Sequence, residues 1–178
     1  MDEPAEDQLV DDEVGNPAVT LEEAIESAWT EIDHHLSNMN PYDFKDLVGA
    51  LIRGLGYHIA WTAPPGRDGG IDLVATPDAL GIQSPRIKVQ VKRQQSTVTV
   101  EGLRSFMAML GTDDVGLFVS LGGFTKDARY EARLQPTRKV TLIDVERFYD
   151  LWVETYPKLQ DEDRRRLPLQ PIYYLAPE

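Results

Sequence analysis

The sequence predicts an α/β domain in which helices flank a mixed β-sheet, with a helical extension at the N-terminus. Apolar residues recur at helical spacing in some segments, and in others they form the short runs typical of strands. These segments follow in the order helix, three strands, and then alternating helices and strands, which is typical of an α/β domain around a mixed sheet. The charge is also divided unevenly along the chain. Residues 1–40 hold twelve of the thirty acids and none of the eighteen Lys and Arg residues.

Composition limits the class of protein. The net charge of −12 belongs entirely to the acidic extension, so the remaining 138 residues are neutral and their composition is compatible with nucleic-acid binding. No apolar run approaches the roughly 18 residues of a membrane span, and the N-terminus lacks the features of a secretory signal. The chain has no cysteine, which excludes disulfides, thiolate metal sites and cysteine nucleophiles. These features predict a cytoplasmic protein without a membrane partner.

The N-terminal extension divides into two parts. Residues 1–19 are acidic and nearly free of aromatic side chains, which predicts disorder. A helix is expected over 20–38, because Thr20 can cap it and Glu23 completes a capping box. Its apolar side chains lie on one stripe, which must be covered either by the same domain or by a second copy of the chain. The stripe comprises Leu21, Ala24, Ile25, Ala28, Trp29, Ile32 and Leu36.

The main domain is expected over residues 40–153, and an extended tail over 154–178. Asn40 followed by Pro41 predicts a helix start, because Asn is a good cap and Pro fits the first helical position. This helix should end at Gly54 or Gly56. The strands are expected at 57–62, 71–76, 86–92, 115–120 and 139–143, and the later helices at 101–111, 125–134 and 144–153.

Three polar residues on two neighbouring strands are the candidate catalytic group. Side chains alternate along a strand, so Gln90 and Lys92 share a face of the strand over 86–92. Asp72 stands between apolar residues on the preceding strand, where a carboxylate is costly unless it has a partner or binds a metal. If the two strands pair, Asp72, Gln90 and Lys92 meet at one end of the sheet.

This group suits phosphodiester hydrolysis with Mg²⁺ or Mn²⁺. Asp72 would supply an anionic oxygen, Gln90 a side-chain carbonyl, and Val91 its backbone carbonyl. Lys92 would orient the attacking water and stabilise negative charge on the phosphoryl oxygens. The spacing alone also fits a purely structural role, with Lys88 and Lys92 on a solvated sheet face and Asp72 in a turn.

The stretch from Pro41 to Phe148 resembles the Mrr-type restriction endonuclease catalytic domain of the PD-(D/E)xK nuclease superfamily. Four segments match in order: PYDFKDLVGALIRGLGY, GRDGGIDLVA, IKVQVKR and LFVSLGGFTKDARYEA. The resemblance implies a restriction-endonuclease-like fold, Mg²⁺ dependence and a DNA substrate. It also implies that the family's acidic ligand, glutamine and lysine correspond to Asp72, Gln90 and Lys92.

One position departs from the family pattern. Members of this family often carry a Phe-Glu pair in the first helix, whose Glu reaches the metal site, whereas this chain has Phe44-Lys45. Asp43 and Asp46 are the nearest acids, but one residue along a helix turns the side chain by about 100°. Asp46 is therefore expected to face solvent or a nearby Arg. The change would mean one metal instead of two, slower turnover, or a domain kept for binding.

Five further residues are candidate DNA contacts. Arg67 is expected either to contact phosphate or, with its neighbour Asp68, to brace the Asp72 strand. Thr125 and Lys126 follow a glycine pair before a helix N-terminus, which suits a phosphate, although Thr125 serves equally as a simple helix cap. Lys88 and Arg93 complete the set.

Two functions are therefore weighed. The first is a metal-dependent DNA endonuclease in restriction, defence or DNA processing, and the second is a catalytically weak nuclease fold that binds DNA or assembles with a partner. Cutting both strands with one site per chain would favour a homodimer, and a separate specificity subunit would read the DNA sequence. Residues 1–36 either mimic DNA and cover the active-site groove or simply keep the chain in solution.

Overall fold

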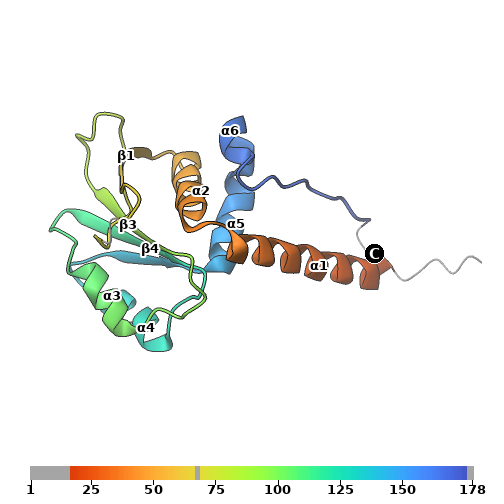
Figure 1. Ribbon diagram of the computed structural model, residues 1–178, viewed down its shortest axis with the longest axis horizontal. Helices are drawn as coiled ribbons and strands as arrows, with labels where there is room; N and C mark the ends of the chain where they lie inside the picture. Colours follow the sequence, from red (N-terminus) through yellow and green to blue (C-terminus); the bar gives the residue numbers. More distant parts are fainter. Residues whose placement is uncertain (1–16, 67–68, 176–178) are drawn as a thin grey trace, which may run out of the picture.

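The computed structural model describes residues 17–66 and 69–175. It confirms an α/β domain with a mixed sheet and flanking helices (Figure 1). In chain order the elements are α1 (Pro17–Asn38), α2 (Pro41–Gly54), β1 (His58–Thr62), β2 (Leu73–Thr76), β3 (Arg86–Lys92), α3 (Val100–Met107), β4 (Asp114–Ser120), α4 (Lys126–Leu134), β5 (Val140–Ile143), α5 (Val145–Thr155), η1 (Tyr156–Lys158) and α6 (Asp161–Arg164).

The sheet has five strands in the order β1-β2-β3-β4-β5, so β3 is central. β1 and β2 pair antiparallel, as do β2 and β3, with Leu73 opposite Val89. The pairing of β2 with β3 meets the condition under which Asp72, Gln90 and Lys92 are expected to come together. β3 and β4 run parallel, as do β4 and β5, and Lys92 lies opposite Ser120. The parallel half is buried under helices on both faces, as parallel strands generally are.

Two apolar clusters hold the helices to opposite faces of the sheet (Figure 1). One joins α2 and α5 to side chains such as Val89 and Val119. The other joins α3 and α4 to Phe118, which contacts the rings of Phe106 and Phe124. Val89 and Phe118 are both fully buried. The alternation along β3 and β4 therefore decides which helix layer each side chain meets.

The first turn of α2 forms as its sequence predicts. The Asn40 side-chain oxygen accepts a hydrogen bond from the Tyr42 N–H at 2.9 Å, and Pro41 occupies the first helical position. Phe44, 0 % exposed, packs against Phe148 of α5. The cap and this aromatic contact fix where α2 starts, which matters because its first turns border the candidate site.

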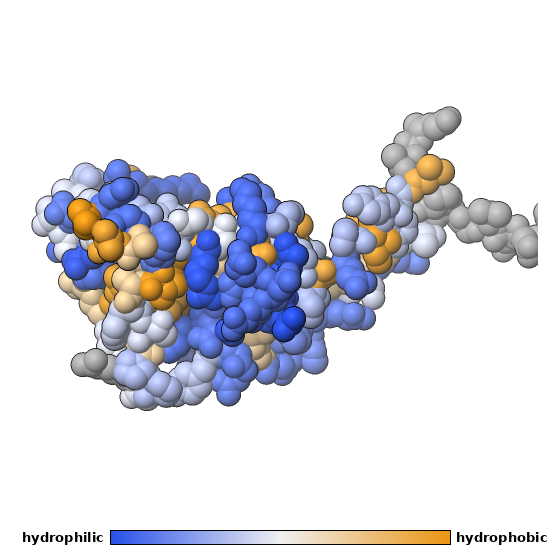
Figure 2. All heavy atoms as spheres, turned by 90° about the horizontal axis from the view of Figure 1, so that it is seen from above, coloured by the Kyte–Doolittle hydropathy of each residue, from blue (hydrophilic) through white to orange (hydrophobic). Residues whose placement is uncertain are grey.

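Helix α1 begins at Pro17, three residues before the predicted start at Thr20. Pro17 stands at the first helical position, where proline loses only an amide that has no intrahelical partner. The disorder predicted over residues 1–19 is wrong for residues 17–19, which belong to the helix, and residues 1–16 lie outside the described residues. The helix projects from the body as an arm (Figures 1 and 2). Its second half docks on its own domain, since Leu36 is buried and Trp29 contacts Tyr149, whereas Ile25 is 60 % exposed.

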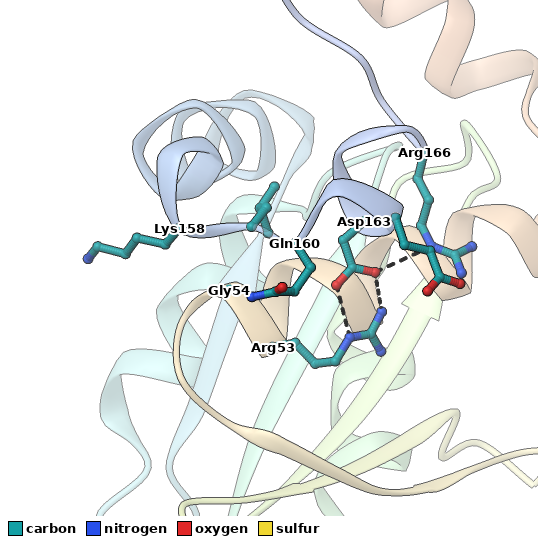
Figure 3. A pocket seen from close by; sticks show the side chains of 8 residues that line it. Arg53, Gly54, Lys158, Gln160, Asp163 and Arg166 are labelled. Atoms are coloured by element: carbon teal, nitrogen blue, oxygen red, sulfur yellow. Dashed lines mark hydrogen bonds and ion pairs between the residues drawn. The ribbon is translucent and has the colours of Figure 1, made fainter.

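The chain after residue 153 is not simply the extended tail that was predicted. It forms η1 and α6, and the Trp152 indole N–H donates to the Leu167 carbonyl at 3.2 Å. The guanidinium of Arg53 in α2 donates two hydrogen bonds to the Asp163 carboxylate, at 2.5 and 3.1 Å (Figure 3). Asp163 is buried, so this part of the chain packs against the domain.

The ion pairs of α6 line a hollow of about 420 Å³ at the C-terminal end of α2 (Figure 3). Arg166 also lies 3.6 Å from Asp46, which confirms the expectation that Asp46 faces an arginine. Three bases and two acids line this hollow, and the ion pairs of Asp163 with Arg53 and Arg166 join the segment after α5 to α2. The hollow is lined by Arg53, Gly54, Lys158, Leu159, Gln160, Glu162, Asp163 and Arg166.

Candidate active site

Asp72 lies directly before β2, where three hydrogen bonds fix it. Its backbone N–H donates to the Val89 carbonyl at 2.8 Å, and its carbonyl accepts from the Ala63 N–H at 2.8 Å. Its side-chain Oδ2 accepts from the Val91 N–H at 2.7 Å. A charge-assisted bond of this kind is stronger than a neutral one, so the carboxylate is held in one orientation against β3.

The predicted residues meet in one hollow of about 390 Å³, which we call the Lys92 hollow. It lies at the end of β3, where the strand continues past β2. Asp72 is the residue directly before β2, and Gln90, Val91 and Lys92 come from consecutive positions of β3. The full lining is Pro41, Gly70, Asp72, Gln90, Val91, Lys92, Arg93 and Gln94.

Lys92 reaches the hollow over an apolar support. Its Nζ lies 5.8 Å from the centre of the Phe118 ring, which is a cation–π contact. The ring is fully buried between α3 and the sheet, so it forms a rigid surface beneath the ammonium group. This support restricts the otherwise flexible lysine.

The Val91 carbonyl points toward the same end of the sheet. Successive carbonyls along a strand point to opposite edges. The neighbouring Lys92 carbonyl accepts from the Leu121 N–H at 3.0 Å, on the β4 side. The Val91 carbonyl therefore points to the β2 side, past the Asp72–Val89 bond with which that ladder ends.

A second hollow of about 250 Å³ adjoins the first, and we call it the Lys45 hollow. The two hollows share Pro41, Asp72 and Val91. Lys45 is 8 % exposed, and its Nζ donates to the Ala63 carbonyl at 2.7 Å. The second hollow is lined by Pro41, Tyr42, Lys45, Ala63, Pro64, Gly66, Asp72 and Val91.

The donor set fits a hard divalent cation. Among the described lining residues of both hollows, Asp72 is the single acid, and it stands among the cations Lys45, Lys92 and Arg93. Within residues 17–66 and 69–175, no group of three His, Cys, Asp or Glu side chains could hold a metal. A carboxylate, the Gln90 amide oxygen and a backbone carbonyl match Mg²⁺, which takes few protein oxygens and retains several waters.

The other predicted contacts lie in different places. Arg93 lines the Lys92 hollow, but its guanidinium also donates to the Ser37 carbonyl at 2.5 Å, tying the end of α1 to β3. Lys88 lines neither hollow. Its Nζ lies 2.8 Å from Asp114, so it serves the β3–β4 pairing.

The predicted phosphate site at the N-terminus of α4 is also separate from both hollows. The Thr125 hydroxyl accepts from the Ala128 N–H at 3.2 Å, so Thr125 caps the helix. Lys126 is exposed in the first turn. Arg67 and its neighbour Asp68 lie outside the described residues.

Two contributors to the site do not follow from single residues or from strand spacing. In the sequence Lys45 stands out only as a departure from the family pattern, and nothing marks Ala63. Their proximity to Asp72 depends on how α2 packs against the chain between β1 and β2. A lysine among the apolar residues Phe44, Leu47 and Val48 is the one local signal, because a charge on a buried helix face implies a specific environment.

The family model Mrr_cat, described as a restriction endonuclease, matches residues 36–152, well over half of the chain. The chain belongs to this restriction endonuclease family. The match includes Asp72, Gln90 and Lys92 and leaves out most of α1 and the segment after α5. Membership supports the nuclease role that the sequence predicted. No curated protein matches the chain significantly in sequence.

Solved structures share the fold. The MspJI restriction endonuclease, in complex with a 27-mer oligonucleotide, aligns with a TM-score of 0.51 and 18 % identity over 85 % of this chain. The DNA modification-dependent restriction endonuclease AspBHI aligns with a TM-score of 0.56 and 19 % identity over 75 %. This chain spans only 35 % and 36 % of their lengths. In the part of the chain that the structure describes, no helix has the length and apolar character to cross a membrane.

Proposed function

We propose that this member of the restriction endonuclease family hydrolyses phosphodiester bonds of DNA with the help of Mg²⁺ or Mn²⁺, in restriction, defence or DNA processing. The observation that carries the proposal is the Asp72 carboxylate, which the Val91 N–H orients in the same hollow as Gln90 and Lys92. A DNA substrate is supported by the fold shared with MspJI, which was solved with an oligonucleotide.

Each side chain has a role that its position allows. Asp72 and Gln90 supply one charged and one neutral oxygen to the cation, and the Val91 carbonyl supplies another. Lys92 stabilises negative charge on the phosphoryl oxygens and orients the attacking water. When bound, the divalent ion lowers the pKa of a water and offsets charge in the transition state.

The surroundings favour an anionic substrate. Three cationic side chains and one acid line the joined hollows among the described residues, so a polyanionic backbone meets a positive local charge. This local balance is opposite to the net charge of the whole chain, −12. The neighbouring structures are more than twice as long as this chain, so we assign recognition of the DNA sequence to a further module or partner.

The experiment that tests the proposal is cleavage of methylated and unmethylated plasmid DNA with Mg²⁺, Mn²⁺ or EDTA. Wild-type protein should nick or linearise plasmid only with metal. Asp72→Asn should lower the rate by about 100-fold or more, because it removes the anionic ligand. Asp150→Asn on α5 is the matched control, since that acid is exposed and lines neither hollow, and it should cut at the wild-type rate.

A second function is favoured by one observation, the buried Lys45 where the family often has an acid. A fold that binds DNA without cutting it would give no cleavage products, either with metal or without it. Wild-type binding of DNA together with an absence of cleavage on every plasmid would overturn the endonuclease proposal and support this alternative. Cleavage that survives Asp72→Asn would show that the assigned ligand is wrong.

A further inference from the structure

We infer that the Lys45 hollow is a binding subsite for a backbone phosphate of the DNA strand, next to the phosphate that is cut, and that Lys45 is its positive charge. The inference rests on the proposed function for the identity of the strand as DNA. It assigns the second hollow to an anion; of the proposed metal ligands, Asp72 and Val91 border both hollows and Gln90 lines only the first.

The first step is the state of the Lys45 side chain. It is 8 % exposed and forms no ion pair within the part of the chain that the structure describes. Its contacts are the Ala63 carbonyl at 2.7 Å and the Tyr42 ring, whose centre is 5.5 Å from Nζ. A buried charge is costly unless it is paired. An ammonium group has three donors, and the carbonyl uses one, so two donors are available to an anion.

The second step is the shape of the site around that charge. Lys45 lines a hollow of about 250 Å³ whose walls are the first turns of α2 and the chain from Ala63 to Gly66. The positive end of the α2 dipole adds to the potential there, since Pro41 and Tyr42 stand in its first turn. The Lys45 ammonium would repel a metal ion in this hollow, whereas a phosphate would neutralise its charge.

The third step is the relation of the two hollows. They share Asp72, Val91 and Pro41, so the hydrogen-bonded residues Asp72 and Val91 border both hollows. Lys92 lies in one hollow and Lys45 in the other. A strand that places its scissile phosphate in the Lys92 hollow brings an adjacent phosphate to the Lys45 hollow. Lys45 thus contributes substrate binding, and Lys92 contributes stabilisation of the reacting group.

The test is the salt dependence of DNA binding, measured without metal. A fluorescently labelled duplex is titrated in EDTA at several salt concentrations with wild type, Lys45→Met, Lys45→Arg and Lys139→Met. Loss of one phosphate contact should reduce the slope of log K against log salt by about one for Lys45→Met. Lys45→Arg keeps the charge and should keep the slope. Lys139→Met is the matched control on an exposed position and should leave the slope unchanged.

A wild-type slope in folded Lys45→Met would overturn the inference. If Lys45→Met does not fold, titration of the wild-type protein with inorganic phosphate, followed by ¹H–¹⁵N NMR, decides. Shifts of the Tyr42, Lys45, Ala63 and Gly66 amides are expected, and their absence at saturating phosphate would contradict the subsite. Neither measurement depends on cleavage, so failure of the endonuclease proposal is recognised separately, by plasmid that stays intact with metal.

Discussion

At the scale of a residue, strand alternation and the family resemblance were enough to predict the place of Asp72 but not its contacts. β2 pairs with β3, the condition that the sequence left open, and this pairing places Asp72 beside Gln90 and Lys92 as expected. The hydrogen bond from the Val91 N–H to the carboxylate was not predictable, because it depends on where the β2–β3 ladder ends. The contact of Lys45 was not predictable either, since its partner is the carbonyl of Ala63, eighteen residues along the chain.

Lys92 should act on the reaction more than on the fold. Lys92→Met keeps an unbranched side chain of similar length and removes the charge, which lies over Phe118 and would stabilise the phosphoryl oxygens. We expect single-turnover cleavage to slow by about 100-fold. The free energy of unfolding should change by about 0.5 kcal/mol or less, as is usual away from the core. Rapid-quench cleavage and urea unfolding measure the two quantities.

Lys88→Met is the matched control, four residues earlier on the same strand. Lys88 lies outside both hollows and pairs with the buried Asp114, so its loss should lower stability and leave the cleavage rate of folded protein unchanged. Equal effects of the two variants on cleavage would contradict the role of Lys92.

Single elements were predictable where their signals are local. Asn40 before Pro41 marked the start of α2, and Thr125 capped α4, because a cap bonds to residues two or three positions away. The prediction of an extended tail after residue 153 was wrong because the contacts of this segment are distant in the sequence. Its acids and bases look solvated in the sequence, but Asp163 meets Arg53, which lies 110 residues earlier. Pairing at that separation depends on the packed fold.

Asp114 at the start of β4 joins two elements, and its removal should destabilise the domain. The carboxylate lies 2.8 Å from Lys88 Nζ and 3.1 Å from Arg86 Nε, and it accepts from the Gly111 N–H at 2.7 Å. Its loss leaves Lys88, which is mostly buried, without its ion partner. We expect Asp114→Asn to lower the free energy of unfolding by about 2–3 kcal/mol. Asp113→Asn, next to it and exposed, should have no effect.

The same contacts predict the pH dependence of that difference. Burial raises the pKa of Asp114, but the hydrogen bonds from Lys88 and Gly111 and the charges of Lys88 and Arg86 outweigh burial and lower it below 3.8. The stabilisation is therefore fully present above about pH 4, and it is lost as the pH falls through the folded-state pKa. Urea unfolding of wild type and Asp114→Asn should give a constant difference down to about pH 4 and a smaller one below. A difference that grows in acid would contradict this role.

The whole molecule separates its charges in space. The acidic helix α1 points away from the body, and only its second half is anchored there, through Leu36, Trp29 and the Arg93–Ser37 bond (Figure 1). Glu22 and Glu26 precede Ser37 by fifteen and eleven residues, which corresponds to about 22 and 16 Å along the helix axis. The Debye length is about 8 Å at 0.15 M salt and about 30 Å at 0.01 M. In the described part of the extension, this geometry favours a solubilising role over a DNA mimic.

The double substitution Glu22→Gln/Glu26→Gln distinguishes these two roles. Truncation through residue 36 would remove the buried Leu36, so substitution is the cleaner change. We expect DNA affinity in EDTA to rise at 0.01 M salt and to equal that of wild type at 0.15 M, because screening removes the repulsion. Glu146→Gln/Glu154→Gln on α5, both exposed, makes the same change in net charge and should behave alike. An affinity gain at 0.15 M for the α1 variant alone would mean that the helix covers the DNA site, which would contradict the arm seen in the structure.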